Sequence, residues 1–313
     1  MMSFASETKN ELSRILPEKQ CCMLAEQAGF IRTCGSIALR GSGRFRIVMN
    51  TEHPAVARHI HTLMKACFRI SPEIEVGRGS RLKKGRYYLL TVEPEQLSEQ
   101  ILRDTGIVMM RNGMNYITDG IYDGLVRKKC DRKAFLRGAF LGAGTMTHPE
   151  KAYRYEIVCN SEMLASDLRR LINTFEGLHA RTAVRRHDHV VYVRDAEQIL
   201  DLLALMGAHS QYFFYEEVRL RKEMRNEANR RSNCDQANID KSVAAAERQL
   251  ASIRKIRDSI GLDALPPKLE ETARARLEHP DVSIEELGKM MDPPLKKSGI
   301  NHRLRKLAEI AQQ

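Results

Sequence analysis

Two segments that are unusually rich in small residues, 109 positions apart, constrain the fold of this chain more than any other feature. In FLRGAFLGAGTM (135–146) five glycines and alanines alternate with apolar residues, and QAGFIRTCGSI (27–37) aligns with it when Gly35 is placed on Gly144. The apolar spacing favours a helix, although each glycine inside a helix costs about 1 kcal/mol relative to alanine. Helices with this many glycines need another backbone packed closely against them.

The similarity continues after these segments. RIVMNTEHPAVARHIHTLM (46–64) matches YEIVCNSEMLASDLRRLI (155–172), with Asn50 placed on Asn160. Each half therefore predicts a small-residue helix, a strand, an amphipathic helix and a basic hairpin, the hairpins lying within 73–92 and 179–196. A repeat of this length predicts a duplicated α+β subdomain. If the two small-residue helices cross at a pseudo-two-fold axis, three residues of each should face the other: Ala28, Gly29 and Gly35 against Gly138, Gly142 and Gly144.

Both segments resemble the LAGLIDADG helix of homing endonucleases, whose two helices pack between two DNA-binding β-saddles. The resemblance implies an acidic residue directly before the final glycine of each helix, where it binds a divalent metal at the scissile phosphate. This sequence has Cys34 and Ala143 there, and it has no Asp or Glu within 27–51 or 132–149. A thiol and a methyl group cannot hold Mg²⁺, a hard cation bound by oxygen ligands. We therefore expect the architecture without catalytic activity.

The chain becomes polar after about residue 220. Four asparagines within 226–238 weaken helix propensity, so we expect a connection there, either a solvated linker or a segment that contacts nucleic acid. Apolar residues then recur on one face of a predicted helix over 239–260, which Gly261 should end.

The last fifty residues predict three short helices. Pro267 starts the first, the capping-box pattern S-x-x-E at Ser283 starts the second, and the third begins near Lys297 after the turn DPPL. The third helix has an apolar side and a basic side, which is typical of a helix-turn-helix; a helical bundle with a solvated basic face is the alternative. Asn can bond adenine and Arg can bond guanine in the major groove. The candidate DNA-binding residues are Lys296, Lys297, Ser298, Asn301, His302, Arg305 and Lys306.

The combination of a degenerate two-copy LAGLIDADG domain, an Asn- and Arg-rich helix and the terminal motif SIEELG…PPLKKSGINHRLRKLAEIA resembles the WhiA family of bacterial regulators. The fold class expected is α+β, with a duplicated LAGLIDADG-like αββα saddle followed by an all-α helix-turn-helix domain. The boundaries expected are 1–125 and 126–222 for the two halves, 223–262 for the linker and long helix, and 263–313 for the helix-turn-helix domain.

The resemblance implies a sequence-specific, non-catalytic DNA-binding protein that regulates transcription and takes part in cell division and chromosome segregation, and in sporulation in some bacteria. The net charge of +11 agrees with a double-stranded DNA partner, and protein co-regulators are a further class of partner. We expect a cytoplasmic, nucleoid-associated protein with no membrane partner and no small-molecule substrate. The alternative function is a nucleoid-associated scaffold whose saddle binds protein rather than DNA.

The predicted hairpin over 78–86 is the candidate DNA contact of the first half. Its basic residues could follow a phosphate backbone, and β-ribbons do enter the major groove, whereas simple solvation explains the same charge. The candidate residues are Arg78, Arg81, Lys83 and Lys84.

No metal centre and no cofactor are expected. The sequence His187-Asp188-His189 lies between two predicted strands, where a polar turn is the simpler interpretation. The seven cysteines are scattered without a CxxC pair, which favours buried reduced thiols over a zinc site or a disulfide framework. They are Cys21, Cys22, Cys34, Cys67, Cys130, Cys159 and Cys234.

Overall fold

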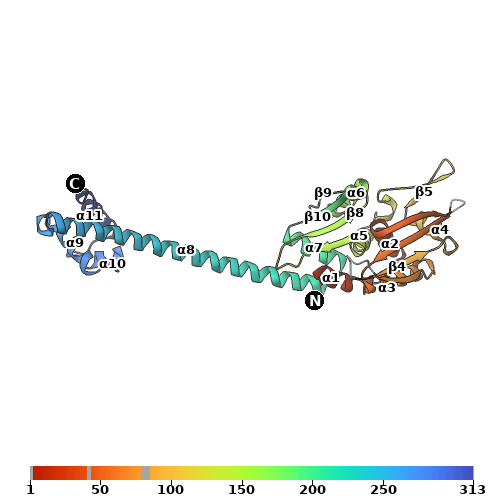
Figure 1. Ribbon diagram of the computed structural model, residues 1–313, viewed down its shortest axis with the longest axis horizontal. Coiled ribbons are helices and arrows are strands. Elements are labelled where there is room, and N and C mark those ends of the chain that lie inside the picture. The colour runs from red at the N-terminus through yellow and green to blue at the C-terminus, as the bar shows by residue number, and fades with distance from the viewer. Residues whose placement is uncertain (1–2, 41–43, 79–84, 313) are drawn as a thin grey trace. The chain divides into compact units, whose positions relative to one another are not determined.

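The computed structural model describes residues 3–40, 44–78 and 85–312, and the chain divides into two compact units, residues 1–222 and 223–313 (Figure 1). The first unit holds the duplicated α+β domain and the second is helical, which confirms the predicted fold class. No helix within the described residues is long and apolar enough to cross a membrane.

The first half of the repeat starts with the small-residue helix α2 (Gln20–Cys34) and continues into an antiparallel sheet of order β1-β2-β4-β3. Helix α3 packs on one face of this sheet, against β2 and β4. Alternate residues of β2, among them Phe45, Ile47 and Met49, are therefore buried. The elements of this half are β1 (Gly35–Arg40), β2 (Arg44–Thr51), α3 (Pro54–Phe68), β3 (Glu73–Arg78) and β4 (Arg86–Val92).

The second half has the same succession and the same strand order, β7-β8-β10-β9, which confirms the duplication predicted from the sequence. Its small-residue helix is α5 (Lys129–Ala143), the counterpart of α2. The elements that follow are β7 (Gly144–Met146), β8 (Tyr155–Cys159), α6 (Glu162–Ile172), β9 (Arg181–Arg185) and β10 (Asp188–Val193). Both predicted hairpins, β3–β4 and β9–β10, are formed by antiparallel pairs.

The remaining elements of the first unit join and cover the two halves. Helix α1 (Phe4–Leu12) contacts both α3 and α5, and α7 (Ala196–Met206) packs on α5. Between the halves lie α4 (Ser98–Asp104), the two-stranded pair β5 (Val108–Arg111) and β6 (Met114–Ile117), and a short 3₁₀ turn, η2 (Asp123–Leu125); another, η1 (Pro94–Gln96), follows β4. One continuous apolar core runs through both halves.

The close packing of α2 on α5 explains three of the glycines. A Cβ built on Gly138 would lie 1.9 Å from the Glu26 carbonyl oxygen of α2, and one built on Gly29 would lie 2.2 Å from the Phe135 carbonyl oxygen of α5. Gly142 faces Thr33 in the same contact. The helices thus approach backbone to backbone, as the sequence predicted.

The prediction was wrong for Gly35 and Gly144. The nearest neighbours of a Cβ at either position belong to the last turn of its own helix, namely the Ile31 carbonyl oxygen for Gly35 and the Phe140 ring for Gly144. The reason is local. Both glycines are the first residues of extended strands that leave the helix ends, where the chain turns sharply back past the preceding turn.

The prediction of a connection within 226–238 was also wrong, because helix α8 (His209–Ser259) runs through this segment without a break. An asparagine costs at most about 0.7 kcal/mol relative to alanine in a helix, and no glycine or proline interrupts this segment. Side-chain pairs one turn apart add support, such as Arg231 with Glu227 and Gln236 with Asp240. Gly261, with a positive φ of 83°, follows the end of the helix as predicted.

The second unit forms around the C-terminal part of α8 (Figure 1). Ile253 and Ile256 of α8 share one apolar core with residues of the three helices expected from the sequence. These are α9 (Pro267–Glu278), α10 (Ile284–Lys289) and α11 (Lys297–Ile310), with a short 3₁₀ turn, η3 (Leu262–Ala264), before α9.

Candidate nucleic-acid interface

Helix α10 begins with a capping box, and the turn that follows it requires a glycine. The Ser283 Oγ accepts a hydrogen bond from the Glu286 N–H at 3.2 Å, and Glu286 Oε2 accepts one from the Ser283 N–H at 2.9 Å. After the helix, the Leu295 N–H donates to the Gly288 carbonyl at 2.8 Å. A Cβ on Gly288 would lie 2.3 Å from the Leu295 carbonyl oxygen, so the turn requires glycine there.

The orientation of α11 follows from its apolar side and from one arginine. Ile300, Leu304 and Leu307 are buried in the core of the second unit, as predicted. Arg303 donates to Glu271 Oε2 at 2.9 Å and to Thr272 Oγ1 at 3.1 Å, both on α9. Sequence reasoning did not single out Arg303. Its charge is the same as that of the exposed arginines, and only its position beside the buried stripe could have indicated an anchoring role.

The opposite side of α11, with its N-terminal approach, forms the surface that we call the basic face. All seven of its residues are exposed, and the structure gives their side chains no hydrogen-bond or ion-pair partner within the residues that it describes. An amide and a guanidinium are thereby available for base edges, and lysines for phosphates. The basic face consists of Lys296, Lys297, Ser298, Asn301, His302, Arg305 and Lys306, the residues predicted from the sequence.

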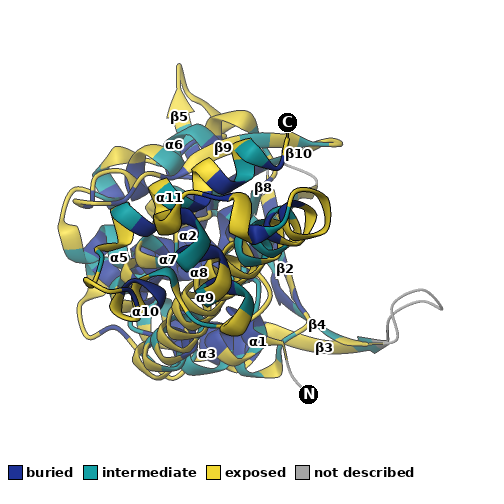
Figure 2. Ribbon diagram, turned by 90° about the vertical axis from the view of Figure 1, so that its left-hand side faces the viewer, coloured by how far each residue is buried: buried dark blue, intermediate teal, exposed yellow. Residues whose placement is uncertain are grey.

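The saddle hairpin of the first half is described only in part. Arg81, Lys83 and Lys84 lie outside the described residues, and Arg78 is placed only as the last residue of β3. The described part of the ribbon formed by β3 and β4 extends from the body of the first unit, and β3 is largely exposed (Figure 2).

Several arginines on the described sheets are neutralised by glutamates. Arg46 Nε lies 2.8 Å from Glu93 Oε1 in the first half, and Arg185 Nη2 lies 2.7 Å from Glu156 Oε1 in the second. Paired arginines of this kind offer less net charge to a phosphate backbone than the basic face of α11 does.

The positions that carry metal-binding acids in LAGLIDADG endonucleases are the last residues of α2 and α5. The Cys34 Sγ donates to the Phe30 carbonyl oxygen at 3.2 Å, and burial raises the pKa of this thiol to about 12. Ala143 offers no donor atom. The nearby Lys9 ammonium adds positive charge beside Cys34. A neutral thiol, a methyl group and an ammonium are unsuited to hold Mg²⁺.

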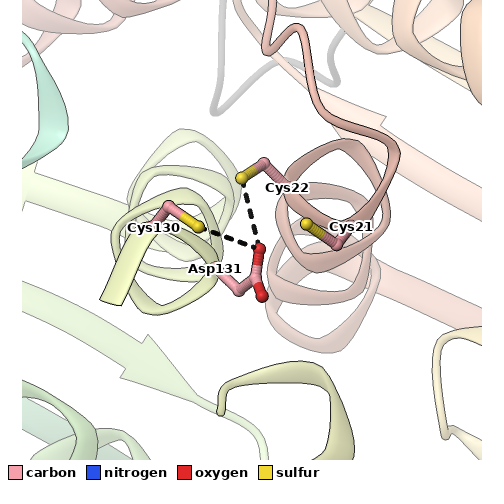
Figure 3. Close-up of side chains that lie close together, drawn as sticks. All are labelled: Cys21, Cys22, Cys130 and Asp131. Atoms are coloured by element: carbon pink, nitrogen blue, oxygen red, sulfur yellow. Dashed lines mark hydrogen bonds between the residues drawn. The ribbon is translucent and has the colours of Figure 1, made fainter. Parts of the chain in front are cut away.

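The His187-Asp188-His189 sequence forms the turn and first residues of β10, in line with the polar turn expected. The metal-ligating side chains that do come together in the described residues belong to Cys21, Cys22, Cys130 and Asp131 (Figure 3). Cysteine spacing could not predict this group, since its two parts are 109 residues apart in the sequence. The signal that could have indicated it is the alignment of the repeat, which places Cys21 on Cys130. All seven cysteines are free, but the expected burial holds fully only for Cys22 and Cys159: Cys234 is exposed, and the other four are half-buried.

Comparison with known proteins agrees with this architecture over nearly the whole chain. The models of the WhiA N-terminal LAGLIDADG-like domain, the WhiA LAGLIDADG-like domain and the WhiA C-terminal HTH domain match residues 20–108, 132–225 and 228–311. Relatives described as "Probable cell division protein WhiA" in Thermoanaerobacter pseudethanolicus and Alkaliphilus metalliredigens are each 44% identical over 312 residues, which covers 100% of this chain and 98% of theirs.

Among solved structures, the crystal structure of full-length DUF199/WhiA from Thermatoga maritima is 27% identical, with a TM-score of 0.62 over 99% of this chain and 98% of that one. The N-terminal LAGLIDADG domain of DUF199/WhiA, solved alone, matches 66% of this chain and 91% of its own with a TM-score of 0.53 at 24% identity, a likeness of fold. The chain therefore belongs to the WhiA family.

Proposed function

We propose that this protein is a sequence-specific, non-catalytic DNA-binding regulator that acts in cell division. The observation that carries the proposal is the basic face of α11, a row of exposed side chains with no partner among the described residues. The helix is anchored by its apolar side and by Arg303. In a helix-turn-helix the second helix enters the major groove and its N-terminal residues contact base edges. Asn301 and Arg305 supply the side chains for adenine and guanine, and Lys296, Lys297 and Lys306 supply phosphate contacts.

The role in cell division comes from the names of the relatives, which are called probable cell division proteins. We infer that a DNA-binding protein of this kind acts through two processes, transcription regulation and chromosome segregation. Both require it to act at the nucleoid in the cytoplasm. The net charge of +11 favours this partner and this location, since phosphate neutralisation supplies most of the sequence-independent affinity for DNA.

The absence of catalysis is inferred from the chemistry of the two helix ends. Cleavage of a phosphodiester with a hard metal ion requires oxygen ligands at the scissile phosphate. Cys34 and Ala143 supply none, and the Lys9 ammonium near Cys34 further disfavours a divalent cation. The saddle then serves as a platform for binding alone.

The test selects genomic DNA fragments that the full-length chain retains, and then measures binding to a selected duplex and to its scrambled version, with and without millimolar Mg²⁺ or Mn²⁺. We expect tighter binding to the selected duplex, a steep decrease with salt, and no cleavage. Equal affinity for the two duplexes would contradict sequence specificity. Metal-dependent nicking that persists through rigorous purification would contradict the non-catalytic assignment.

A second candidate function is favoured by one observation. The pair β5–β6 carries exposed apolar side chains, among them Met110, Met114 and Tyr116, and several sheet arginines are ion-paired. A first unit with this surface suits contact with protein, with DNA held by the second unit alone. In that case Arg78, Arg81, Lys83 and Lys84 could be neutralised without a change in DNA affinity.

A further inference from the structure

The starts of the two central helices carry four potential metal ligands at equivalent positions. Helix α2 follows its N-cap Lys19, so Cys21 and Cys22 are its second and third residues. Helix α5 follows its N-cap Lys128, so Cys130 and Asp131 are the second and third residues there. The repeat therefore brings two ligand pairs to the pseudo-two-fold axis. This end of the helices is opposite to the end with Cys34 and Ala143, so the group is separate from the positions of the lost endonuclease acids.

The four ligand atoms converge on one small volume. The Cys22 Sγ donates to Asp131 Oδ1 at 3.2 Å, the Cys130 Sγ lies 3.5 Å from the same oxygen, and all four atoms lie within 4.8 Å of one another (Figure 3). In a tetrahedral zinc site with Zn–S bonds of about 2.3 Å, the ligand atoms are separated by about 3.8 Å. A contraction of about 1 Å would therefore close the group around a single ion.

The Asp131 carboxylate supplies an independent reason to expect a cation. The residue is only 4% exposed, and within the described residues its carboxylate contacts only the two thiols as hydrogen-bond donors. Buried carboxylates are normally paired with a cation, held by several strong donors or bound to a metal. Thiols are weak donors. No Lys, Arg or His side chain of the described residues forms an ion pair with Asp131, whereas the buried Glu26 on the same helix pair has Arg137.

We propose that Cys21, Cys22, Cys130 and Asp131 bind one Zn²⁺ ion that ties the start of α2 to the start of α5. Three sulfurs and one oxygen favour zinc over Mg²⁺ or Ca²⁺, which take oxygen ligands. Cys21 and Cys130 are only half-buried and leave a route for the ion to enter. The site depends only on the contact of the two halves and not on DNA binding.

The experiment uses the full-length chain, reduced and freed of metal, titrated with Zn²⁺ against a chromophoric chelator. Co²⁺ replaces Zn²⁺ in a parallel titration, because thiolate-bound cobalt has a characteristic absorption. The variants are the double substitution Cys22→Ser with Cys130→Ser, and Asp131→Asn. The control is Cys67→Ser with Cys234→Ser, which removes two cysteines outside the group. Circular dichroism and thermal unfolding of each metal-free variant establish that it is folded.

We expect one zinc per wild-type chain, thiolate-to-cobalt absorption, and a higher midpoint of thermal unfolding with zinc present. The Cys22→Ser, Cys130→Ser variant should bind more than about 100-fold less tightly, beyond the 10- to 100-fold typical of losing an outer-shell partner. Asp131→Asn should weaken binding less, and the control should bind as wild type. The proposal is overturned if wild type binds no zinc at micromolar concentration, or if the folded double variant binds equally. A Cys22–Cys130 disulfide in metal-free protein isolated from reducing cytoplasm would overturn it as well.

Discussion

Glu26 on α2 and Arg137 on α5 form a buried ion pair in the contact between the two halves of the duplicated domain. Arg137 Nε donates to Glu26 Oε2 at 3.0 Å, and Glu26 is fully buried. The other carboxylate oxygen lies 2.7 Å from His59 Nε2 of α3, and Arg137 Nη1 donates to the Met206 carbonyl at 3.3 Å. Each group has one partner in its own half, but the charges of Glu26 and Arg137 are balanced only across the contact, so correct pairing of the halves is a condition of burying both.

The first prediction concerns this pair. Arg137→Met leaves the Glu26 carboxylate buried without its guanidinium, and removing one partner of a buried pair typically costs about 3–5 kcal/mol. Replacing both residues, as Glu26→Leu with Arg137→Met, should destabilise less than Arg137→Met alone because no unpaired charge remains. Urea unfolding followed by circular dichroism measures both. If the double variant is the less stable of the two, the pair is not acting through buried charge.

The second prediction tests the backbone approach of α2 and α5. Gly138→Ala places a Cβ 1.9 Å from a backbone oxygen that cannot rotate away, so the helices must separate. Overpacking of this kind costs about 1–3 kcal/mol or more. Gly142→Ala meets the Thr33 side chain first and should cost less.

The matched control for these variants is Gly85→Ala, since a Cβ there would meet nothing within 4 Å. The free energies of unfolding should therefore rank Gly85→Ala above Gly142→Ala, and Gly142→Ala above Gly138→Ala. Equal stabilities of the Gly138 and Gly85 variants would show that the helices do not approach as closely as described.

The duplicated domain could be predicted because its signals are local and occur twice. The glycines, the strand alternation and the equivalent Asn50 and Asn160 all follow from short-range pattern. The continuity of α8 through 226–238 could not be predicted in this way. The free-energy cost of asparagine in a helix is small, and side-chain pairs together with the lack of glycine or proline outweigh it.

Two features of the sites depend on packing and were beyond sequence pattern. The anchoring role of Arg303 requires the position of Glu271 on α9, since charge alone does not distinguish Arg303 from Arg305. The convergence of Cys22 with Asp131 requires the crossing of two helices whose starts are 109 residues apart. Gly35 and Gly144 were misplaced for a related reason: the alignment located the helix ends correctly but not the direction in which the chain leaves them.

The third prediction is a pH dependence of stability from Lys9. This lysine is 6% exposed, and burial lowers its pKa from 10.5 to about 8. Between these values the unfolded chain holds a proton that the folded chain has released, so the free energy of unfolding should rise with pH. Below about pH 8 the full cost of burying the charge is present. Lys9→Met removes the titrating group and should be the more stable protein at neutral pH.

The measurement is urea unfolding of wild type and Lys9→Met across that pH range. The difference between the two proteins isolates Lys9 from the cysteines and tyrosines that titrate in the same range. The difference should shrink as the pH rises from about 8 towards 10.5. A difference that stays constant would mean that Lys9 keeps its ordinary pKa in the folded protein.

The fourth prediction separates base recognition from phosphate contact. Asn301→Ala and Arg305→Ala remove groups suited to base edges, so each should lose about 1–3 kcal/mol for a selected duplex and little for a scrambled one. Lys306→Ala, on the same exposed side of α11, should weaken binding to both duplexes alike and reduce the salt slope by about 1, as loss of a phosphate contact does. Neutralising Arg81, Lys83 and Lys84 together should have the same kind of effect if the saddle hairpin follows the DNA backbone.

Arg303→Ala serves as a structural control, because its side chain faces α9. It should lower the unfolding midpoint of the second unit, which the Asn301 and Arg305 variants should leave unchanged. The assay is fluorescence anisotropy with both duplexes over a salt series. If the Asn301 and Arg305 variants discriminate between the duplexes as wild type does, α11 is not the recognition helix. If discrimination is lost only in the hairpin variants, the specificity lies in the saddle.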